Sequence, residues 1–181
     1  IEKSKYLLKV AEEVNRFVER EKAFVVLGGP GFTKSELLSL LKDKFKHINA
    51  VEESTSSIGP SGVREILRRG VLNRILQNSL LIRDSKLVDE FLFRLVKKPS
   101  LVAYGMGEVK NAVERGAVDA LLVSERLLKN VSPEERGLIE ELCRKTESYG
   151  GKVYFIGAEH EKGLQLFNLG GIAALLRFSV A

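Results

Sequence analysis

The stretch Val-Ala-Tyr-Gly-Met-Gly-Glu-Val-Lys-Asn-Ala-Val-Glu-Arg-Gly-Ala-Val-Asp-Ala-Leu-Leu-Val-Ser, residues 102–124, decides the fold class of this chain. It opens within a short apolar run at 101–104, continues with a helix-like segment at about 107–115, and closes with a second apolar run at 118–123. Short apolar runs separated by helical patterns are typical of strands joined by helices. The stretch therefore predicts a β-α-β unit.

The same alternation continues to the end of the chain. Strand-like runs follow at 153–156 and 172–178, and helix-like segments lie at about 133–149 and 161–168. This pattern predicts a three-layer α/β domain with helices on both faces of a sheet. We place its start near Pro99, because the pattern and the charge both change there and proline cannot continue a helix. The predicted domains are therefore residues 1–98 and 99–181.

The first predicted domain mixes helices and short strands. An apolar residue at every third or fourth position predicts an amphipathic helix over residues 3–21. A polar loop at 54–62 interrupts the later part of the domain. The remaining elements that the patterns predict are strands at 23–27 and 48–51 and helices at 33–46, 61–70, 72–80 and 84–97.

Composition and charge narrow the class of protein. The chain has 181 residues, 44% of them apolar and 29% charged, which is the balance of a folded globular protein. No run has the length of a membrane span, so we expect a cytoplasmic protein without membrane contact. The single cysteine, Cys143, excludes an internal disulfide framework and a cysteine-based zinc site, and we expect it to be a small buried residue.

The net charge of +5 is unevenly distributed. Residues 1–98 contain 19 basic and 13 acidic side chains, whereas residues 99–181 contain 10 and 11. This asymmetry suits contact with RNA or another polyanion, although a solvated Lys/Glu-rich helical surface is the commoner origin of so small an excess. The chain starts at Ile1 without an initiator methionine or a signal segment, and we expect it to be a fragment of a longer protein or a processed chain.

A near-match to a phosphate-binding loop lies at residues 28–35. The pattern G-x-x-x-x-G-K-[ST] fails at Thr33, and Pro30 removes a backbone donor that a phosphate would need. Thr33 and Glu36 have the spacing of a helix capping box, which explains the segment without a nucleotide. Phe32 is then either an exposed partner contact or a hydrophobic staple on Leu37. We expect no cofactor here.

No residue pattern indicates catalysis or a metal site. His47 and His160 stand alone, and Glu159-His160-Glu161 lacks the second histidine of a zinc helix. We expect His160 to begin a helix among solvated carboxylates. The serines near the polar loop have no nucleophile-elbow setting. The best candidates for contact with an RNA phosphate backbone are three basic residues that share one short helix: Arg64, Arg68 and Arg69.

Four segments in order carry a resemblance to a known family. They are Gly-Gly-Pro-Gly-Phe-Thr-Lys (28–34), Ser-Gly-Val-Arg-Glu-Ile-Leu-Arg-Arg-Gly (61–70), the quoted stretch at 102–124, and Gly-Gly-Ile-Ala-Ala-Leu-Leu-Arg-Phe (170–178). Together they resemble the archaeal Pelota family, ribosome-rescue relatives of the class I release factors of archaea and eukaryotes. The resemblance spans nearly the whole chain.

The resemblance implies a fold for each predicted domain. Residues 1–98 are similar to the later part of the family's central domain, which has a ribonuclease-H-like topology. Residues 99–181 resemble the family's C-terminal domain, whose three-layer α/β/α fold is similar to that of kink-turn-binding ribosomal proteins. The Sm-like N-terminal domain of the family and the first strands of its central domain would precede Ile1.

The resemblance also implies a function and partners. The family recognises stalled ribosomes with an elongation-factor-1α-type GTPase, and an ATP-binding-cassette ATPase then splits the subunits in ribosome recycling and no-go decay of mRNA. The family's Pro-Gly-Phe motif faces the GTPase, and it maps here onto Pro30, Gly31 and Phe32. We therefore expect a monomeric, non-catalytic translation surveillance factor that binds ribosome, RNA, GTPase and ATPase.

Other functions stay open at the level of the sequence. A class I release factor would have a Gly-Gly-Gln loop, which would be found immediately before Ile1. Some archaeal members are credited with a divalent-metal-dependent mRNA endonuclease in the N-terminal domain, and no metal pattern in this chain supports that activity here. A stand-alone RNA-binding module would use residues 99–181, but the near-neutral charge of that half argues against it.

Overall fold

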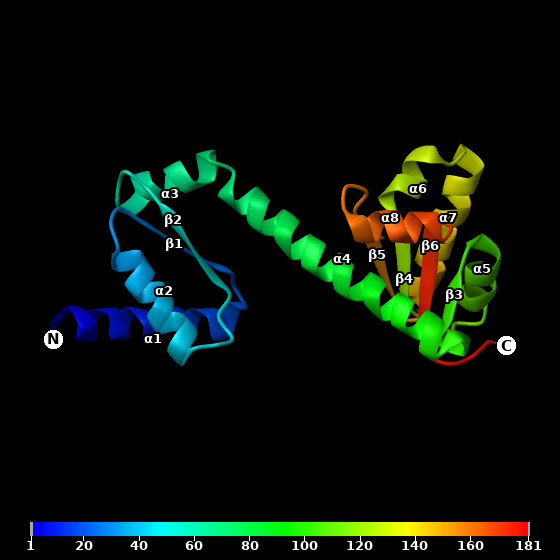
Figure 1. The fold of residues 1–181 in the computed structure, drawn as a ribbon, viewed down its shortest axis with the longest axis horizontal. Coiled ribbons are helices and arrows are strands. Elements are labelled where there is room, and N and C mark those ends of the chain that lie inside the picture. The colour runs from blue at the N-terminus through cyan, green and yellow to red at the C-terminus, as the bar shows by residue number, and fades with distance from the viewer. Residues whose placement is uncertain (1, 181) are drawn as a thin grey trace. The chain divides into compact units, whose positions relative to one another are not determined.

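The computed structural model describes residues 2–180, which form two compact units, one up to Ile75 and the other from Leu76 onward (Figure 1). Helix α4 begins in the first unit and ends in the second. The first unit contains α1 (Glu2–Glu21), β1 (Val25–Gly29), α2 (Thr33–Lys44), β2 (Ala50–Ser54), α3 (Gly59–Arg68) and the start of α4 (Val71–Lys97). The second unit adds η1 (Pro99–Leu101), β3 (Val102–Tyr104), α5 (Met106–Glu114), β4 (Val118–Ser124), α6 (Glu125–Asn130), α7 (Pro133–Ser148), β5 (Lys152–Ile156), α8 (Glu161–Asn168) and β6 (Ile172–Leu176).

The first unit is built on two parallel strands, with Val25 of β1 opposite Ala50 of β2. Helices α1 and α2 pack against each other and supply most of its core. The apolar stripe of α1 buries Leu7, Ala11 and Val18, as the spacing of residues 3–21 predicts. Because both strands run in the same direction, the loops that follow them leave from the same edge of the sheet.

The second unit is a four-stranded sheet in the order β3-β6-β4-β5, with β4 and β5 parallel and β6 antiparallel to its neighbours. Successive residues of β4 serve two cores: Leu121 and Val123 pack with α5 and α7, whereas Ala120 and Leu122 pack with α4 and α8. Helices on both faces confirm the predicted three-layer α/β/α architecture.

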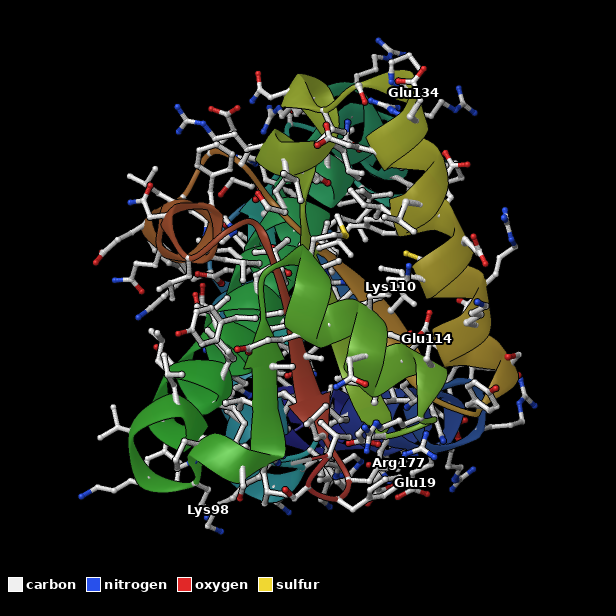
Figure 2. All side chains as sticks on the ribbon, turned by 90° about the vertical axis from the view of Figure 1, so that its right-hand side faces the viewer. Glu19, Lys98, Lys110, Glu114, Glu134 and Arg177 are labelled. Atoms are coloured by element: carbon white, nitrogen blue, oxygen red, sulfur yellow. The ribbon has the colours of Figure 1, made fainter. Side chains whose placement is uncertain are left out.

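The outer surfaces of the helices in the second unit are charged. Figure 2 shows Lys110 and Glu114 of α5 and Glu134 of α7 projecting away from their helices, and all three side chains are exposed.

Helix α7 begins with a capping box, in which Ser132 Oγ accepts from the amide of Glu135 and the Glu135 carboxylate accepts from the amide of Ser132.

The structure differs from the sequence prediction along α4. The predicted helices at 72–80 and 84–97 are one continuous helix, because Leu81, Ile82 and Arg83 between them are all compatible with helix. The compact units divide between Ile75 and Leu76 instead of near Pro99. Val88 and Phe91 explain this difference, since both are fully buried in the core of the second unit. Helix α4 ends at Lys97, and η1 begins at Pro99.

Candidate functional site

The two segments singled out as candidate contact sites lie in the first unit at one edge of the β1–β2 sheet. The Pro30–Phe32 turn follows the carboxyl end of β1, and the loop before α3 follows the carboxyl end of β2. Crevices outside the carboxyl ends of parallel strands are a common place for binding sites. The fold therefore brings together two candidate sites that are separated by more than 30 positions in the sequence.

Phe32 is the most exposed large apolar residue found among the described residues. Its exposed fraction is 85%, so its ring does not pack on Leu37, and the hydrophobic-staple alternative is wrong. Gly31 precedes it with φ of +69°, a backbone conformation that favours glycine, and this turn directs the chain into α2. The ring of Phe32 is therefore accessible to a partner, as the partner-contact alternative requires.

The capping box predicted from Thr33 and Glu36 is absent, because the helix starts one residue earlier. Phe32 is the N-cap residue, with φ of −99° and ψ of −7°, and no side chain caps this helix. The carbonyl of Phe32 accepts from the amides of Ser35 and Glu36. The Glu36 carboxylate instead accepts from Lys3 Nζ of α1 at 2.7 Å. The prediction was wrong because the spacing of a capping box does not fix where a helix begins.

The polar groups of the near-match to a phosphate loop have partners within the protein. Lys34 Nζ donates to the carbonyl of Gly31, and Ser35 Oγ donates to Glu52 Oε2 on β2 at 2.6 Å. The Ser35 hydroxyl thus has the Glu52 carboxylate as its partner. The Ser35–Glu52 bond holds the start of α2 to β2, and the Lys34–Gly31 bond lies within the turn from which Phe32 projects.

The three arginines of the predicted basic surface have different environments. Arg69 Nη1 donates to the carbonyl of Ser54 at 2.6 Å, and its Nη2 forms an ion pair with Glu65. Arg64 and Arg68 are exposed, and neither has an ion pair or a side-chain hydrogen bond within residues 2–180. Arg69 therefore joins α3 to the end of β2, whereas Arg64 and Arg68 present their charge to solvent.

Glu65 organises the loop before α3. Its Oε2 accepts from the amide and the hydroxyl of Ser56, at 2.9 and 3.0 Å. The hydrogen bond from the Ser56 amide, together with the nearby Arg69 guanidinium, lowers the pKa of Glu65 below its ordinary value. Gly62 fits against the same loop, because a Cβ there would lie 2.4 Å from the carbonyl oxygen of Ser57. The Glu65 carboxylate thus holds the loop at Ser56, and the absence of a side chain at Gly62 lets α3 lie close to Ser57.

Two hollows connect the candidate segments. One, of about 560 Å³, is lined by Phe32 and Lys34 on one side and by Glu53 and Arg69 on the other. The second, of about 360 Å³, is lined by Arg68, Arg69 and serines of the loop before α3. Because Arg69 lines both, the exposed phenylalanine and the basic helix belong to one continuous surface. We call it the Phe32–Arg68 surface.

A second polar cluster, in the second unit, was missed by the sequence analysis. Asp84 of α4 is buried, and its carboxylate accepts from Arg83 Nη2 at 2.7 Å, from the Gly157 amide at 2.9 Å and from His160 Nε2 at 3.1 Å. His160 Nδ1 accepts from the amide of Gly163, so His160 caps α8 as well as contacting Asp84. His160 does begin a helix, as predicted, but its carboxylate partner is buried rather than solvated.

A sequence signal for this cluster existed. Asp84 precedes the buried residues Val88 and Phe91 by four and seven positions, so it continues their stripe on α4. A carboxylate on a buried stripe needs partners, because an unpaired buried charge is very costly. These partners come from the loop after β5, more than 70 residues away.

The other titratable side chains considered as candidates, His47 and Cys143, lie apart from both clusters. His47 is exposed, and burial raises the pKa of the half-buried Cys143 thiol, which packs against the core of the second unit. Among residues 2–180, no three His, Cys, Asp or Glu side chains come together as metal ligands. Nor does any helix in that range have both the length and the apolar character needed to cross a bilayer.

Comparisons with known proteins relate this chain to translation factors. A family model described as eRF1 domain 3 matches residues 81–180. The chain is similar to the protein pelota homolog of Methanosarcina barkeri, with 39% identity over 180 residues, which is 98% of this chain and 51% of that protein. The chain spans about half the length of the curated relatives it matches.

Solved structures give the same relationship. The crystal structure of Archaeoglobus fulgidus Pelota matches with 36% identity and a TM-score of 0.67, over 97% of this chain and 54% of that one. A chain from a model of ribosome-bound archaeal Pelota and ABCE1 matches with 38% identity and a TM-score of 0.78, over 98% of this chain and 50% of that one.

Proposed function

This chain belongs to the archaeal Pelota family, and from that premise we propose that it is part of a translation surveillance factor. In this proposal the full protein recognises stalled ribosomes together with an elongation-factor-1α-type GTPase. It then promotes dissociation of the ribosome and mRNA quality control by no-go decay. The protein works in the cytoplasm as a monomer, and its partners are the ribosome, RNA, the GTPase and an ATP-binding-cassette recycling ATPase.

One observation carries the proposal. The archaeal Pelota chain that aligns with 98% of this chain comes from a model bound to the ribosome together with ABCE1. The match covers both compact units, so both units have counterparts in a protein that occupies a ribosome. The activity of the whole protein is inferred from this half of it.

The Pro30–Phe32 turn is proposed as the contact with the GTPase. Phe32 is 85% exposed, and it projects from a turn that Lys34 and Ser35 hold in place. A rigid, exposed aromatic side chain offers a large apolar area at a small cost in conformational entropy, which is typical of the residues that dominate protein interfaces. Pro30 restricts the turn further, and Gly31 adopts the positive φ that the turn requires.

Truncation of Phe32 tests this assignment. Phe32→Ala should reduce binding of the chain to the purified GTPase, measured by calorimetry, by about tenfold or more, the scale of an interface hot spot. Its free energy of unfolding should change by less than about 0.5 kcal/mol because the side chain is exposed. The matched control is Phe17→Ala, which truncates another exposed phenylalanine of the same unit. Equal affinities of the two variants would count against the assignment.

The exposed arginines of α3 are proposed as the contact with ribosomal RNA. Arg64 and Arg68 are four positions apart and therefore lie on the same face of the helix. Arginine without an internal partner is available to pair with phosphate oxygens. Arg69 stays in the proposed surface, but its bonds to Ser54 and Glu65 mean that it also positions the helix.

Charge reversal separates an RNA contact from a loss of stability. Arg64→Glu and Arg68→Glu should weaken ribosome binding. They should also reduce the slope of log K against log salt concentration by about 0.7–0.9 for each phosphate contact that is lost. Lys42→Glu, at an exposed position on α2, is the control. Weaker binding with an unchanged salt slope would exclude a phosphate contact.

Two rival functions make different predictions for the full protein. A class I release factor would carry a Gly-Gly-Gln loop and hydrolyse peptidyl-tRNA in a ribosome-bound release assay. A divalent-metal-dependent mRNA endonuclease would cleave RNA only when the metal is supplied, through residues outside this chain. The surveillance proposal requires no cofactor bound by residues 2–180. Release activity that depends on a Gly-Gly-Gln loop would replace the proposal with the first rival.

A further inference from the structure

A groove in the second unit lies outside the Phe32–Arg68 surface and has no role in the proposed function. It has a volume of about 740 Å³ and is lined by the first turns of α4 within this unit, by β5 and by the loop before α8. Three large apolar side chains in its lining are about half exposed: Leu80 (48%), Leu81 (41%) and Phe155 (46%). Exposed apolar side chains gathered in one groove are typical of an interaction surface.

The groove follows the open edge of the sheet. Strand β5 is the last strand in the order β3-β6-β4-β5, so one side of it has no neighbouring strand among the described residues. Successive residues of a strand direct their backbone groups to opposite sides. The carbonyl of Phe155 accepts from Arg83 Nη2 at 2.9 Å. The backbone N–H and C=O groups of residues 153, 155 and 157 therefore point away from β4.

Arg83 and Asp84 close one end of this edge. Arg83 supplies a donor to the carbonyl of Phe155, and Asp84 supplies an acceptor to the amide of Gly157 at 2.9 Å. These two side chains therefore make the hydrogen bonds that an added strand would make there. Within residues 2–180, the amide and carbonyl of Val153 and the amide of Phe155 on the same edge have neither a neighbouring strand nor a side-chain partner.

The charged residues of the groove favour basic side chains in a ligand. The rim carries the exposed carboxylates of Glu125 and Glu159. Arg83 is the basic residue of the lining, and its charge is neutralised by Asp84 at 2.7 Å. The groove is thus acidic on a chain whose net charge is +5. A ligand that complements it carries Lys or Arg beside its apolar side chains.

We propose that this groove binds a short extended peptide segment of a protein partner, which adds to β5 beside Val153. The peptide backbone pairs with the open groups of Val153 and Phe155. One of its apolar side chains packs against Leu81 and Phe155, and a neighbouring Lys or Arg pairs with Glu125 or Glu159. Strand addition of this kind draws affinity from the main chain and specificity from alternate side chains.

Peptides of alternating sequence test the proposal directly. The probes are Ac-Lys-Val-Lys-Val-Lys-Val-NH2, the same peptide with Glu in place of Lys, and the Lys peptide with N-methylated amides, each titrated into the ¹⁵N-labelled 181-residue chain. The Lys peptide should shift the amide resonances of Val153 and Phe155. The Glu peptide and the N-methylated peptide should bind at least about tenfold more weakly. Absence of binding by the Lys peptide at about 1 mM would overturn the proposal.

Variants with matched controls locate the binding. Val153→Pro removes an edge donor, and proline is tolerated on an edge strand whose N–H faces solvent. Leu81→Ser removes an apolar contact, and Leu164→Ser is its control, since Leu164 is 42% exposed but does not line the groove. Val153→Pro and Leu81→Ser should each weaken Lys-peptide binding about tenfold, and Leu164→Ser should leave it unchanged. Folding of each variant is checked by circular dichroism.

Two further outcomes decide between occupants. Glu159→Lys should weaken binding of the Lys peptide in a salt-dependent way and strengthen binding of the Glu peptide, with Glu134→Lys on α7 as the control. Equal binding of both peptides to the wild type would refute the charge argument. Self-association of the chain that Val153→Pro abolishes, without any peptide binding, would assign the edge to a second copy of this chain and overturn the proposal.

Discussion

Substitution of Asp84 by alanine should destabilise the second unit by about 3 kcal/mol. The Asp84 side chain is only 3% exposed, and its two oxygens accept from three groups: the Arg83 guanidinium, the Gly157 amide and the His160 ring. Removing one partner of a fully buried charge pair costs about 3–5 kcal/mol. The cost here lies at the lower end, because the side chains of Arg83 and His160 are 38% and 19% exposed and can regain water.

The assay follows the stability of the second unit. Urea unfolding monitored by circular dichroism gives the change in free energy, and the midpoint of thermal unfolding should fall by about 6–12 °C for a chain of this length. Amide exchange at Gly157 should become faster, since its N–H loses the carboxylate acceptor. Asp84→Asn keeps one acceptor oxygen and should cost less than Asp84→Ala.

Asp89→Ala provides the matched control. Asp89 lies on the same helix and pairs with Lys162 at 2.6 Å, but its side chain is 58% exposed. Exposed ion pairs contribute less than about 1 kcal/mol, so this variant should remain close to the wild type. If Asp84→Ala were as stable as Asp89→Ala and Gly157 kept its protection, the carboxylate would not hold α4 to the loop after β5, and the reasoning would fail.

Three further predictions concern the first unit and the helix caps. The pKa of Glu65 is lowered in the folded chain, so its contribution to stability is present above its unfolded pKa of about 4.3 and is lost as the pH falls through the folded value. Between pH 7 and pH 3, the free energy of unfolding measured in urea should therefore fall less for Glu65→Gln than for the wild type. Gly62→Ala should lower the free energy of unfolding by about 1–3 kcal/mol, because its Cβ would lie 2.4 Å from the Ser57 carbonyl oxygen. The control is Gly107→Ala on α5, which has open space around it and should not destabilise the chain. Ser132→Ala should cost about 1 kcal/mol through loss of the α7 cap, and Thr33→Ala should cost less than half of that because Thr33 caps nothing; equal costs would contradict the cap assignments.

Much of the second unit could be predicted from the sequence, because its two central strands, β4 and β6, are buried on both faces. A strand such as β4, whose residues Ala120 to Val123 are all buried, leaves a continuous apolar run between two helical patterns. The short α6 was not predicted, since six residues do not establish a helical period. Its start depends on the Ser124 side chain, which accepts from the Leu127 amide.

The candidate site could be predicted only in pieces. The Pro30–Phe32 turn and the basic helix were each found from local patterns, but their proximity depends on the parallel pairing of β1 with β2. Strand pairing between distant segments leaves no local signal, as it is set by the packing of the whole unit. The same holds for Asp84, whose partners Gly157 and His160 approach it only in the folded second unit.

Arg64 and Arg68 of α3 and its C-cap residue Arg69 therefore divide into two roles. Arg64 and Arg68 share one helical face, while Arg69 is turned by one residue toward the end of β2, where Ser54 and Glu65 bind its guanidinium. Arg69 also lines the hollow that contains Phe32. A substitution of Arg69 would thus move the basic helix and the surroundings of Phe32 at once, and reduced binding could arise from either. Arg64 and Arg68 have no internal partner to lose, so a salt-dependent loss of binding on their reversal can be attributed to the RNA contact itself.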